Sequence, residues 1–430
     1  MFSKKILLPH QYYYPGIEMV EDRVTDEKRQ DLIRHLDGGK KEVLLYIHFP
    51  FCDSHCAFCG FDKRYHLEEI ETYVEHLKKE LAFYSQFGYK IQNIHFGGGT
   101  PTLVPGESLK GIIDFVKEHF DCSPEMDINI EGSATSIYRD DIIQFIKDCG
   151  VTRTSVGIQT FDPRMRDVFQ TQATLEQVYL TLSTLKENDI DVFVDILFGY
   201  PDFQVGSTPE EIVKSDIIEA ISLGVAGIDF SQIFPYGNKL AKIIEEKGLS
   251  FPSMNQIVSH MQECMEMMED NGYHQQTSYG FVRQGRIIME TSYYGGMEKV
   301  SDTLAVGCSA FGLINGYKYR NSMYSGYMRQ DIPSYIHVKK LTDSQMEQMN
   351  IVSFSKLLQL SKAMVENSPR RAYFEEKLQN LIQGGMVEEM DDRYRITKTG
   401  RLFVDNIYYY MLDDEERNVI QKEMQMVEFD

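Results

Sequence analysis

Hydrophobic and polar positions follow two alternating periods along the first 250 residues of the chain. Short apolar runs of strand length are separated by longer stretches in which apolar residues recur every three or four positions, as in an amphipathic helix. The strand-like runs lie at 42–48, 91–96, 126–131, 153–158, 190–197 and 226–231. The helix-like stretches lie near 68–87, 107–119, 139–149, 175–188 and 209–223. This repeat predicts parallel strands in one sheet with helices on its outer face.

Six such units predict an α/β fold whose sheet curves into an incomplete (β/α)6 barrel. A closed barrel of this class has eight strands, and its active site lies at the C-terminal ends of the strands. We therefore expect the chemistry of this chain in the segments that follow the predicted strands.

The alternation fades after residue 250, and the pattern changes twice more. A helix rich in methionine is predicted at 254–271, followed by an irregular stretch rich in glycine and tyrosine at 272–330. From about residue 340 the order is helix, helix, a hairpin at 387–397 and a further helix, which predicts a winged-helix-like α+β cap. The expected organisation is an N-terminal arm (1–41), the partial barrel (42–250), a barrel extension that lines the substrate site (251–335) and the cap (336–430).

Composition and charge narrow the class of protein. The chain has 430 residues, of which 42% are hydrophobic and 25% charged, as in an ordinary soluble globular protein. It carries 65 acidic against 44 basic residues, a formal charge of -21, which argues against a nucleic-acid partner. No apolar run approaches the roughly 20 residues of a transmembrane helix, and the N-terminal apolar run is too short for a signal peptide. We expect a cytoplasmic protein.

Three of the seven cysteines form a compact motif directly after the first predicted strand. Cys52, Cys56 and Cys59 have the spacing C-x3-C-x2-C, and a soft sulfur set of this kind selects zinc, copper(I) or an iron–sulfur cluster. Structural zinc takes four ligands, and His48 or His55 could supply the fourth. A cubane cluster held by three cysteines instead leaves one iron open. The residues alone leave zinc and the cluster as alternatives.

Two further segments at predicted strand ends could contact a ligand. Gly97, Gly98 and Gly99 precede Thr100-Pro101, and successive glycines let a backbone approach a ligand closely. Glu131 ends the third predicted strand, where its carboxylate could accept a hydrogen bond from a cofactor or lie in solvent.

The cysteine motif within residues 45–60 resembles that of the radical S-adenosylmethionine (SAM) enzymes, and the surrounding sequence is similar to the oxygen-independent coproporphyrinogen III oxidase branch. The resemblance runs from about residue 42 to 412. It implies a radical SAM barrel and a [4Fe-4S] cluster bound by Cys52, Cys56 and Cys59, whose open iron is chelated by SAM. A flavodoxin or ferredoxin-like protein would supply the electron that cleaves SAM to a 5′-deoxyadenosyl radical.

The same resemblance implies a role for each residue near the cofactors. Those expected near the cluster-bound SAM are Tyr46, Gly98 and Glu131, and those expected near a second SAM are Phe58, Gly99, Thr100, Gln159 and Asp195. Thr171 stands where relatives carry an arginine, and this difference changes the contacts expected with the second SAM.

Three activities occur within this branch. The oxidase has a further cysteine where this chain has Phe61, and the haem chaperones have a histidine where it has Arg320 and a tryptophan, which it lacks altogether. Class C methyltransferases use two SAM molecules, and residues 59–61, 130–132 and 304–317 look most like the anaerobilin synthases, which methylate haem and open its ring without oxygen.

We therefore expect a radical SAM methyltransferase that acts on an unsaturated carbon of a planar substrate, most readily haem, with release of iron. The alternatives are a methylase of a quinone or aromatic natural product, a coproporphyrinogen III dehydrogenase and a non-catalytic haem carrier. Glu131 is the one named candidate for a catalytic base. Several tyrosines could stack on a flat substrate or serve as ordinary packing: Tyr279, Tyr293, Tyr294, Tyr317 and Tyr319.

Overall fold

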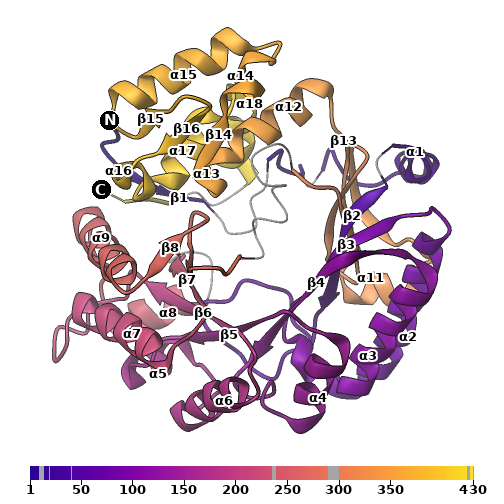
Figure 1. The fold of residues 1–430 in the computed structure, drawn as a ribbon, viewed down its shortest axis with the longest axis horizontal. Helices are drawn as coiled ribbons and strands as arrows, with labels where there is room; N and C mark the ends of the chain where they lie inside the picture. The colour runs from indigo at the N-terminus through magenta and orange to yellow at the C-terminus, as the bar shows by residue number, and fades with distance from the viewer. Residues whose placement is uncertain are drawn as a thin grey trace.

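The centre of the protein is a twelve-stranded sheet that curves into a partial barrel (Figure 1). The computed structural model describes residues 1–8, 14–18, 20–39, 41–234, 239–288, 300–423 and 427–429. Six parallel strands pair in chain order at the middle of the sheet: β2 (Glu42–Phe49), β3 (Lys90–Gly98), β4 (Asp121–Ser133), β5 (Arg153–Gln159), β6 (Val192–Phe198) and β7 (Gly227–Gln232). The predicted α/β partial barrel is confirmed.

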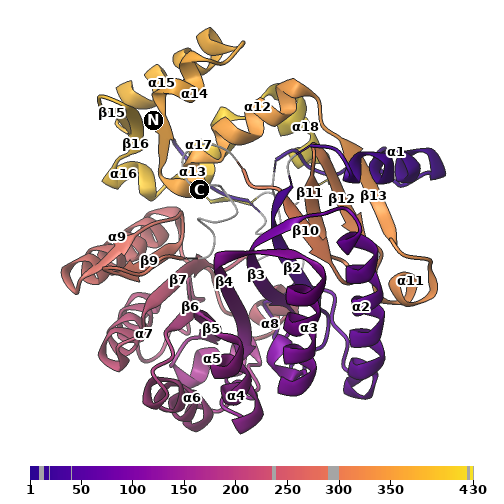
Figure 2. The same cartoon turned by 45° about the vertical axis from the view of Figure 1, so that its right-hand side comes forward.

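Helices cover the outer face of these strands (Figure 2). They are α2 (Ile70–Ser85), α3 (Gly106–His119), α4 (Asp140–Cys149), α6 (Leu175–Glu187), α7 (Pro209–Leu223) and α9 (Met254–Asp270). Helices α5 (Pro163–Phe169) and α8 (Lys239–Glu246) contact the segment 52–59 instead, where Ala57 N donates to Phe169 O at 2.7 Å and Leu240 N donates to Ala57 O at 2.9 Å. Short 3-10 turns are η1 (Leu67–Glu69) and η2 (Pro101–Leu103). Helix α7 begins with a capping box between Thr208 and Glu211 and ends at Gly224, whose φ is +80°. Helices α5 and α8 escaped prediction because each is too short to display a helical period.

Further short strands extend the sheet beyond both ends of this set of six. Strand β10 (Thr303–Val306) pairs parallel to β2 and is followed outward by β11 (Phe311–Ile314), β12 (Tyr317–Asn321) and β13 (Tyr335–Lys340). Beyond β7 lie β9 (Gly280–Arg283) and β8 (Tyr273–Gln275). For the described residues of 272–330, the prediction of an irregular stretch is therefore wrong, because strands of three to five residues are too short for alternation to be recognised reliably.

The N-terminal arm packs along the outer edge of β13. Val24 N donates to Ile336 O at 2.9 Å, and Val338 N donates to Asp22 O at 2.9 Å. Arg23 forms an antiparallel bridge with His337, and helix α1 (Asp26–Leu36) follows. Helix α11 (Tyr324–Arg329) lies between β12 and β13 in the chain.

The C-terminal residues form a separate α+β unit with its own hydrophobic core, in orange and yellow in Figure 1. Its three-stranded sheet has the order β14-β16-β15, and β15 and β16 form the hairpin that the sequence predicted. The elements are α12 (Asp343–Val352), α13 (Phe354–Leu357), β14 (Gln359–Ser361), α14 (Lys362–Glu366), α15 (Arg371–Gln383), β15 (Val387–Glu389), β16 (Arg393–Ile396), α16 (Lys398–Arg401), α17 (Val404–Met411) and α18 (Asp414–Glu423). The winged-helix-like cap is confirmed.

Both chain ends and the barrel extension contact this cap. Strand β1 (Lys5–Leu7) pairs antiparallel with β17 (Val427–Phe429), and Ile6 N donates to the Asn406 side chain at 2.9 Å. Tyr279 of the extension donates to Asp405 at 2.9 Å. Strand β13 pairs with β12 as far as Lys340, so the main sheet continues past the expected domain boundary between residues 335 and 336. That boundary stays a proposal. Within the described part of the chain, no helix combines the length and the apolar character needed to cross a membrane.

Candidate active site

The cysteine loop follows β2 at the C-terminal edge of the sheet and is held at several points. Cys52 N donates to Arg64 O at 3.0 Å and Arg64 N donates to Pro50 O at 2.7 Å, which closes the loop on itself. Ala57 N donates to Phe169 O at 2.7 Å, at the end of α5. The backbone of this loop is therefore fixed by its neighbours, with the three cysteines on it.

The Lys63 ammonium interacts with all three thiols of the motif. Burial lowers the pKa of Lys63, but the combined effect of Cys59, Cys52 and Cys56 is larger and of opposite sign. The net pKa of Lys63 is therefore raised. Burial also raises the pKa of Cys56, against the Ser54 hydroxyl 2.8 Å from its sulfur, which lowers it. At Cys56 the Lys63 charge and the Ser54 hydroxyl therefore act against burial, and the net direction of its pKa stays upward.

The described residues contain no group of three or more His, Cys, Asp or Glu side chains spaced to hold one metal ion. A cubane cluster binds each cysteine through a different iron and so does not require three sulfurs to meet at one point. Of the two histidines considered as zinc ligands, His55 is exposed and stacks on Tyr65 at 3.9 Å, and His48 is buried beside Tyr46.

The glycine triplet packs against the end of β2 and the cysteine loop. Gly99 N donates to Phe49 O at 2.7 Å. A Cβ on Gly98, where φ is +114°, would lie 2.6 Å from Phe49 O, and one on Gly99 would lie 2.4 Å from Phe51 O. The expected reason for the glycines was a close approach to a ligand, whereas the structure gives close packing between two strand ends as a sufficient reason.

Glu131 is the centre of a polar group on the inner face of the sheet. Its carboxylate contacts His95 Nε2 at 2.9 Å and accepts from Gly98 N at 3.3 Å. The ring of Tyr46 stands edge-on to His95, with centroids 5.4 Å apart, and the Tyr46 hydroxyl contacts His48 Nδ1 at 3.0 Å. Burial lowers the pKa of His48 to about 4, so this imidazole is neutral near pH 7.

Sequence reasoning selected Tyr46, Gly98 and Glu131 but not the histidine that joins them. His95 is paired in register with Tyr46, and it carries the hydrogen bond to Glu131. The available signal was alternation: Tyr46 and His95 each lie three residues before the end of their strand, so their side chains point to the same face of the sheet.

Gln159 and Asp195 meet on the inner face of the next two strands. Gly157 is paired in register with Asp195, and a Cβ on Gly157 would lie 2.9 Å from Gln159 Nε2 and 3.7 Å from Asp195 Oδ2. Gln159 itself has φ +71°, the left-handed region that costs energy for a residue with a side chain. Such a conformation persists only when the surroundings enforce it.

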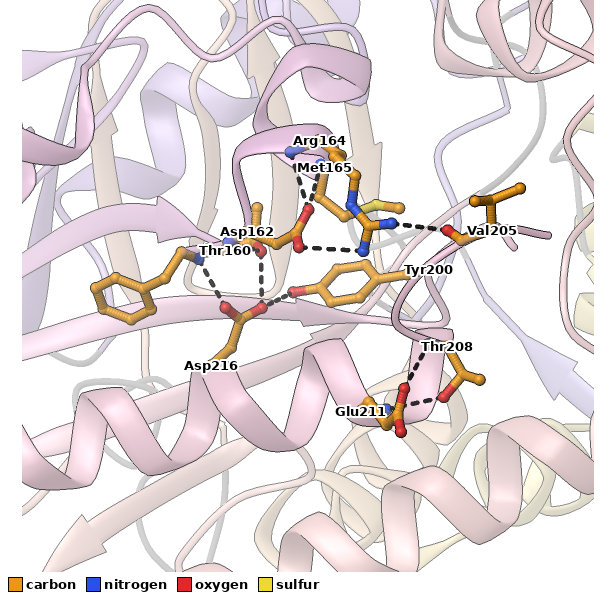
Figure 3. Close-up of polar contacts among 10 residues, drawn as sticks. Thr160, Asp162, Arg164, Met165, Tyr200, Val205, Thr208, Glu211 and Asp216 are labelled. Atoms are coloured by element: carbon orange, nitrogen blue, oxygen red, sulfur yellow. Dashed lines mark hydrogen bonds and ion pairs between the residues drawn. The ribbon is translucent and has the colours of Figure 1, made fainter. Parts of the chain in front are cut away.

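Buried hydrogen bonds around Asp216 (Figure 3) fix the residues that follow Gln159. Asp216 of α7 accepts from Phe161 N, from the Thr160 hydroxyl and from the Tyr200 hydroxyl, each at 2.7 Å. The Tyr200 hydroxyl also lies 3.0 Å from Gln159 O. Desolvation raises the pKa of Asp216 to about 6.

Arg166 holds the same turn from the other side. Its Nη1 donates to Ile158 O at 3.0 Å and to Thr160 O at 2.8 Å. Thr171 N donates to Arg166 O at 3.1 Å, so Thr171 ends the α5 segment. Phe58 packs edge-on against Phe169 of α5 at 5.5 Å. The segment that carries Gln159 is thus tied through α5 to the cysteine loop.

Replacing Asp216 with asparagine is expected to change how stability depends on pH. A carboxyl with a raised pKa binds its proton more tightly in the folded state, so its contribution to stability is present below its unfolded pKa of 3.8 and is lost as pH rises towards about 6. The free energy of unfolding of the wild type, relative to Asp216→Asn, should therefore fall by on the order of 3 kcal/mol over this window. Urea unfolding at pH 4 to 7 measures it. Asp148→Asn, at an exposed site on α4, should give a flat difference, and a difference that grows with pH for Asp216→Asn would contradict the assignment.

Three of the tyrosines considered for substrate stacking are structural. Tyr279 is bonded to Asp405 of the cap, Tyr317 donates to Asp31 at 2.6 Å, and Tyr319 bonds the backbone of β10. Tyr293 and Tyr294 lie outside the described residues. For the three that are described, ordinary packing is the correct alternative.

Comparisons with known proteins follow the same lines as the geometry. Residues 46–213 match the family model described as the radical SAM superfamily. The anaerobilin synthase of Escherichia coli O157:H7 is 29% identical over 301 residues, which are 68% of this chain and 65% of that protein. The heme chaperone HemW of Buchnera aphidicola subsp. Schizaphis graminum is 24% identical over 384 residues, 86% of this chain and 98% of that protein. Among solved structures, coproporphyrinogen III oxidase (HemN) from Escherichia coli, a radical SAM enzyme, matches with a TM-score of 0.77 at 20% identity, over 93% of this chain and 96% of that one.

Proposed function

We propose that this chain, a HemN-like radical SAM protein that uses a [4Fe-4S] cluster and SAM, methylates an unsaturated carbon of a planar substrate, with haem as the first candidate. The observation that carries the proposal is the division of the inner face into two polar sets on adjoining strands. One set, on β2 to β4, contains Tyr46 and Glu131, and the other, on β5 and β6, contains Gln159 and Asp195. Two sets fit an enzyme that binds two SAM molecules.

The residues at the C-terminal edge fit the cluster and the first SAM. Cys52, Cys56 and Cys59 would hold the cluster, since all three lie on one loop whose backbone is fixed by its neighbours and all three interact with the Lys63 ammonium. Glu131, with 41% of its side chain exposed, would accept a hydrogen bond from the SAM ammonium while His95 holds it in place. When bound and reduced, the cluster and SAM supply a 5′-deoxyadenosyl radical.

The second SAM would be held by Gln159 and Asp195, with Phe58, Gly99 and Thr100 beside it. Gly99 N and Thr100 N donate to the carbonyls of Phe49 and Phe51, so the group that Thr100 can offer is its hydroxyl. Thr171 offers no guanidinium, and the nearby Arg166 guanidinium is occupied by backbone carbonyls. Binding of the second SAM would therefore depend on the backbone turn at Gln159.

Methyl transfer to an unsaturated carbon replaces a hydrogen, so a proton must leave the substrate. Among the described residues of the inner face, the Glu131–His95 pair is the candidate to accept it, because its two members are already joined by a hydrogen bond and Glu131 is partly open. The electron donor would be a flavodoxin or ferredoxin-like protein.

The second candidate is a haem carrier in which the cluster has no catalytic role. The similarity to HemW, which covers 98% of that protein, favours it. It differs from the first candidate in predicting binding without turnover.

Anoxic protein reconstituted with iron and sulfide, then supplied with dithionite, SAM and haem, is expected to form 5′-deoxyadenosine together with S-adenosylhomocysteine and to bleach the haem absorption band. The two nucleoside products are measured by liquid chromatography. Deoxyadenosine without S-adenosylhomocysteine would exclude methyl transfer, and haem binding without either product would favour the carrier. A product pair formed only with a quinone would move the assignment to the other methylases.

A further inference from the structure

Arg320 lies at the same edge of the sheet as the cysteine loop and faces the inner side. β10 runs parallel to β2, and β11 and β12 alternate in direction, so the last residues of β12 reach the C-terminal edge. Tyr319 points outward, where it packs against Tyr335, whose hydroxyl bonds Tyr84 of α2. Alternation along the strand then turns Arg320 inward. Its charge accordingly acts on His48, which it helps to keep neutral.

Among the residues that the structure describes, none pairs with the Arg320 guanidinium through a hydrogen bond or ion pair. It has five N–H donors, and its buried Nε has no hydrogen bond. Over the described ranges, no hydrogen bond or ion pair to this side chain is found, and Asp62 acts on it only through its charge. The group rests instead on the ring of Phe311, 4.9 Å from the centroid. Burial lowers its pKa. A buried N–H donor without a partner is costly unless water or a ligand accepts a hydrogen bond from it.

The backbone next to Arg320 is held by hydrogen bonds of Asn321. A mobile strand therefore does not explain why the guanidinium lacks a polar partner among the described residues. Asn321 Nδ2 donates to Glu80 Oε1 and to Gly307 O, each at 2.9 Å, and Asn321 N donates to Ala310 O at 2.9 Å. By contrast, Arg64, which is also half-buried near the cysteine loop, makes a two-pronged pair with Glu69 at 2.8 and 2.5 Å.

We propose that Arg320 binds a carboxylate of the substrate, which rests on the proposed function in placing the substrate at this edge. A guanidinium over an aromatic ring presents a planar pair of donors that matches a carboxylate. The substrate class is then a planar molecule that carries an acidic side chain, such as the propionates of haem, and not a neutral quinone. The SAM carboxylate offers the same chemistry, so the test must separate the two sources.

The test compares haemin with haemin dimethyl ester, which lacks the free carboxylates. We expect the wild type to bind haemin about 10- to 100-fold more tightly than the ester by absorption titration. Arg320→Met should bind both alike, and Arg320→Lys should recover part of the preference. Arg329→Met, which removes an exposed arginine of α11, should leave the preference intact. Equal binding of the two probes by the wild type would overturn the proposal.

Two further measurements separate substrate binding from other roles. The affinity for SAM, measured by equilibrium dialysis without haemin, should be unchanged in Arg320→Met, and a loss of tenfold or more would assign the contact to SAM and overturn the proposal. The melting temperature of ligand-free Arg320→Met should equal or exceed that of the wild type by about 1 to 3 °C, because an unpaired charge is removed. A fall of several degrees, absent in Arg329→Met, would indicate a structural role instead.

These outcomes are independent of methyl transfer. Charge-selective binding without S-adenosylhomocysteine would contradict the proposed function alone. Turnover of haem without discrimination between acid and ester would contradict the role of Arg320 alone.

Discussion

Replacing Cys56 with alanine is expected to leave the reconstituted protein without the brown colour of a [4Fe-4S] cluster and to reduce 5′-deoxyadenosine below detection. Two remaining thiolates cannot hold a cubane cluster that already leaves one iron without a protein ligand. Iron and sulfide content, the absorption near 400 nm and deoxyadenosine formation with dithionite are measured on the same preparation.

The control for Cys56 is Cys122→Ala. Cys122 is also half-buried, but its sulfur contacts only the Phe120 carbonyl among the polar groups of the described chain. It should keep the full cluster and full activity. A coloured Cys56→Ala protein that still cleaves SAM would remove the foundation of the proposed function.

Replacing Glu131 with glutamine is expected to weaken SAM binding by about 10- to 100-fold, because a charge-assisted hydrogen bond to an ammonium is lost. An amide in this position must also set its NH2 group against His95 Nε2 or Gly98 N, each of which now contacts a carboxylate oxygen. Binding is followed by the change that SAM causes in the electron paramagnetic resonance spectrum of the reduced cluster.

Glu118→Gln on the exposed face of α3 is the matched control, since it makes the same chemical change away from the sheet edge. Its affinity for SAM and its cluster content should equal those of the wild type. If Glu131→Gln retained normal SAM affinity and lost only the rate of methyl transfer, the proposed contact with the SAM ammonium would be wrong and the role as proton acceptor would stand.

The parallel strands and their helices could be predicted because each is long enough to display its period. The strands at the two ends of the sheet could not, since β10 to β12 contain four or five residues each. One local signal was present: Asn315-Gly316 joins β11 and β12, and both residues have positive φ, at 50° and 78°. Such a pair between apolar runs is typical of a hairpin turn.

The candidate site was predicted as a set of residues, and the structure adds how they are held. A motif can identify Gln159, but not that Tyr200 and Asp216, 41 and 57 positions further on, enforce its backbone. Likewise, nothing local to Glu131 reveals His95, because their contact depends on the pairing of β3 with β4. The sequence indicated only that Arg320 stands where the haem chaperones have a histidine. Its lack of polar partners among the described residues depends on its three-dimensional surroundings.

Residues 22–24 determine what one edge of the molecule offers to other chains. β13 is a terminal strand of the main sheet, and the free backbone groups of such a strand are a template on which a second molecule can add a strand. Asp22 and Val24 already occupy Val338 N and Ile336 O. The arm therefore blocks the addition of a further strand at β13. Removal of the chain up to Val24 would expose this edge and favour self-association.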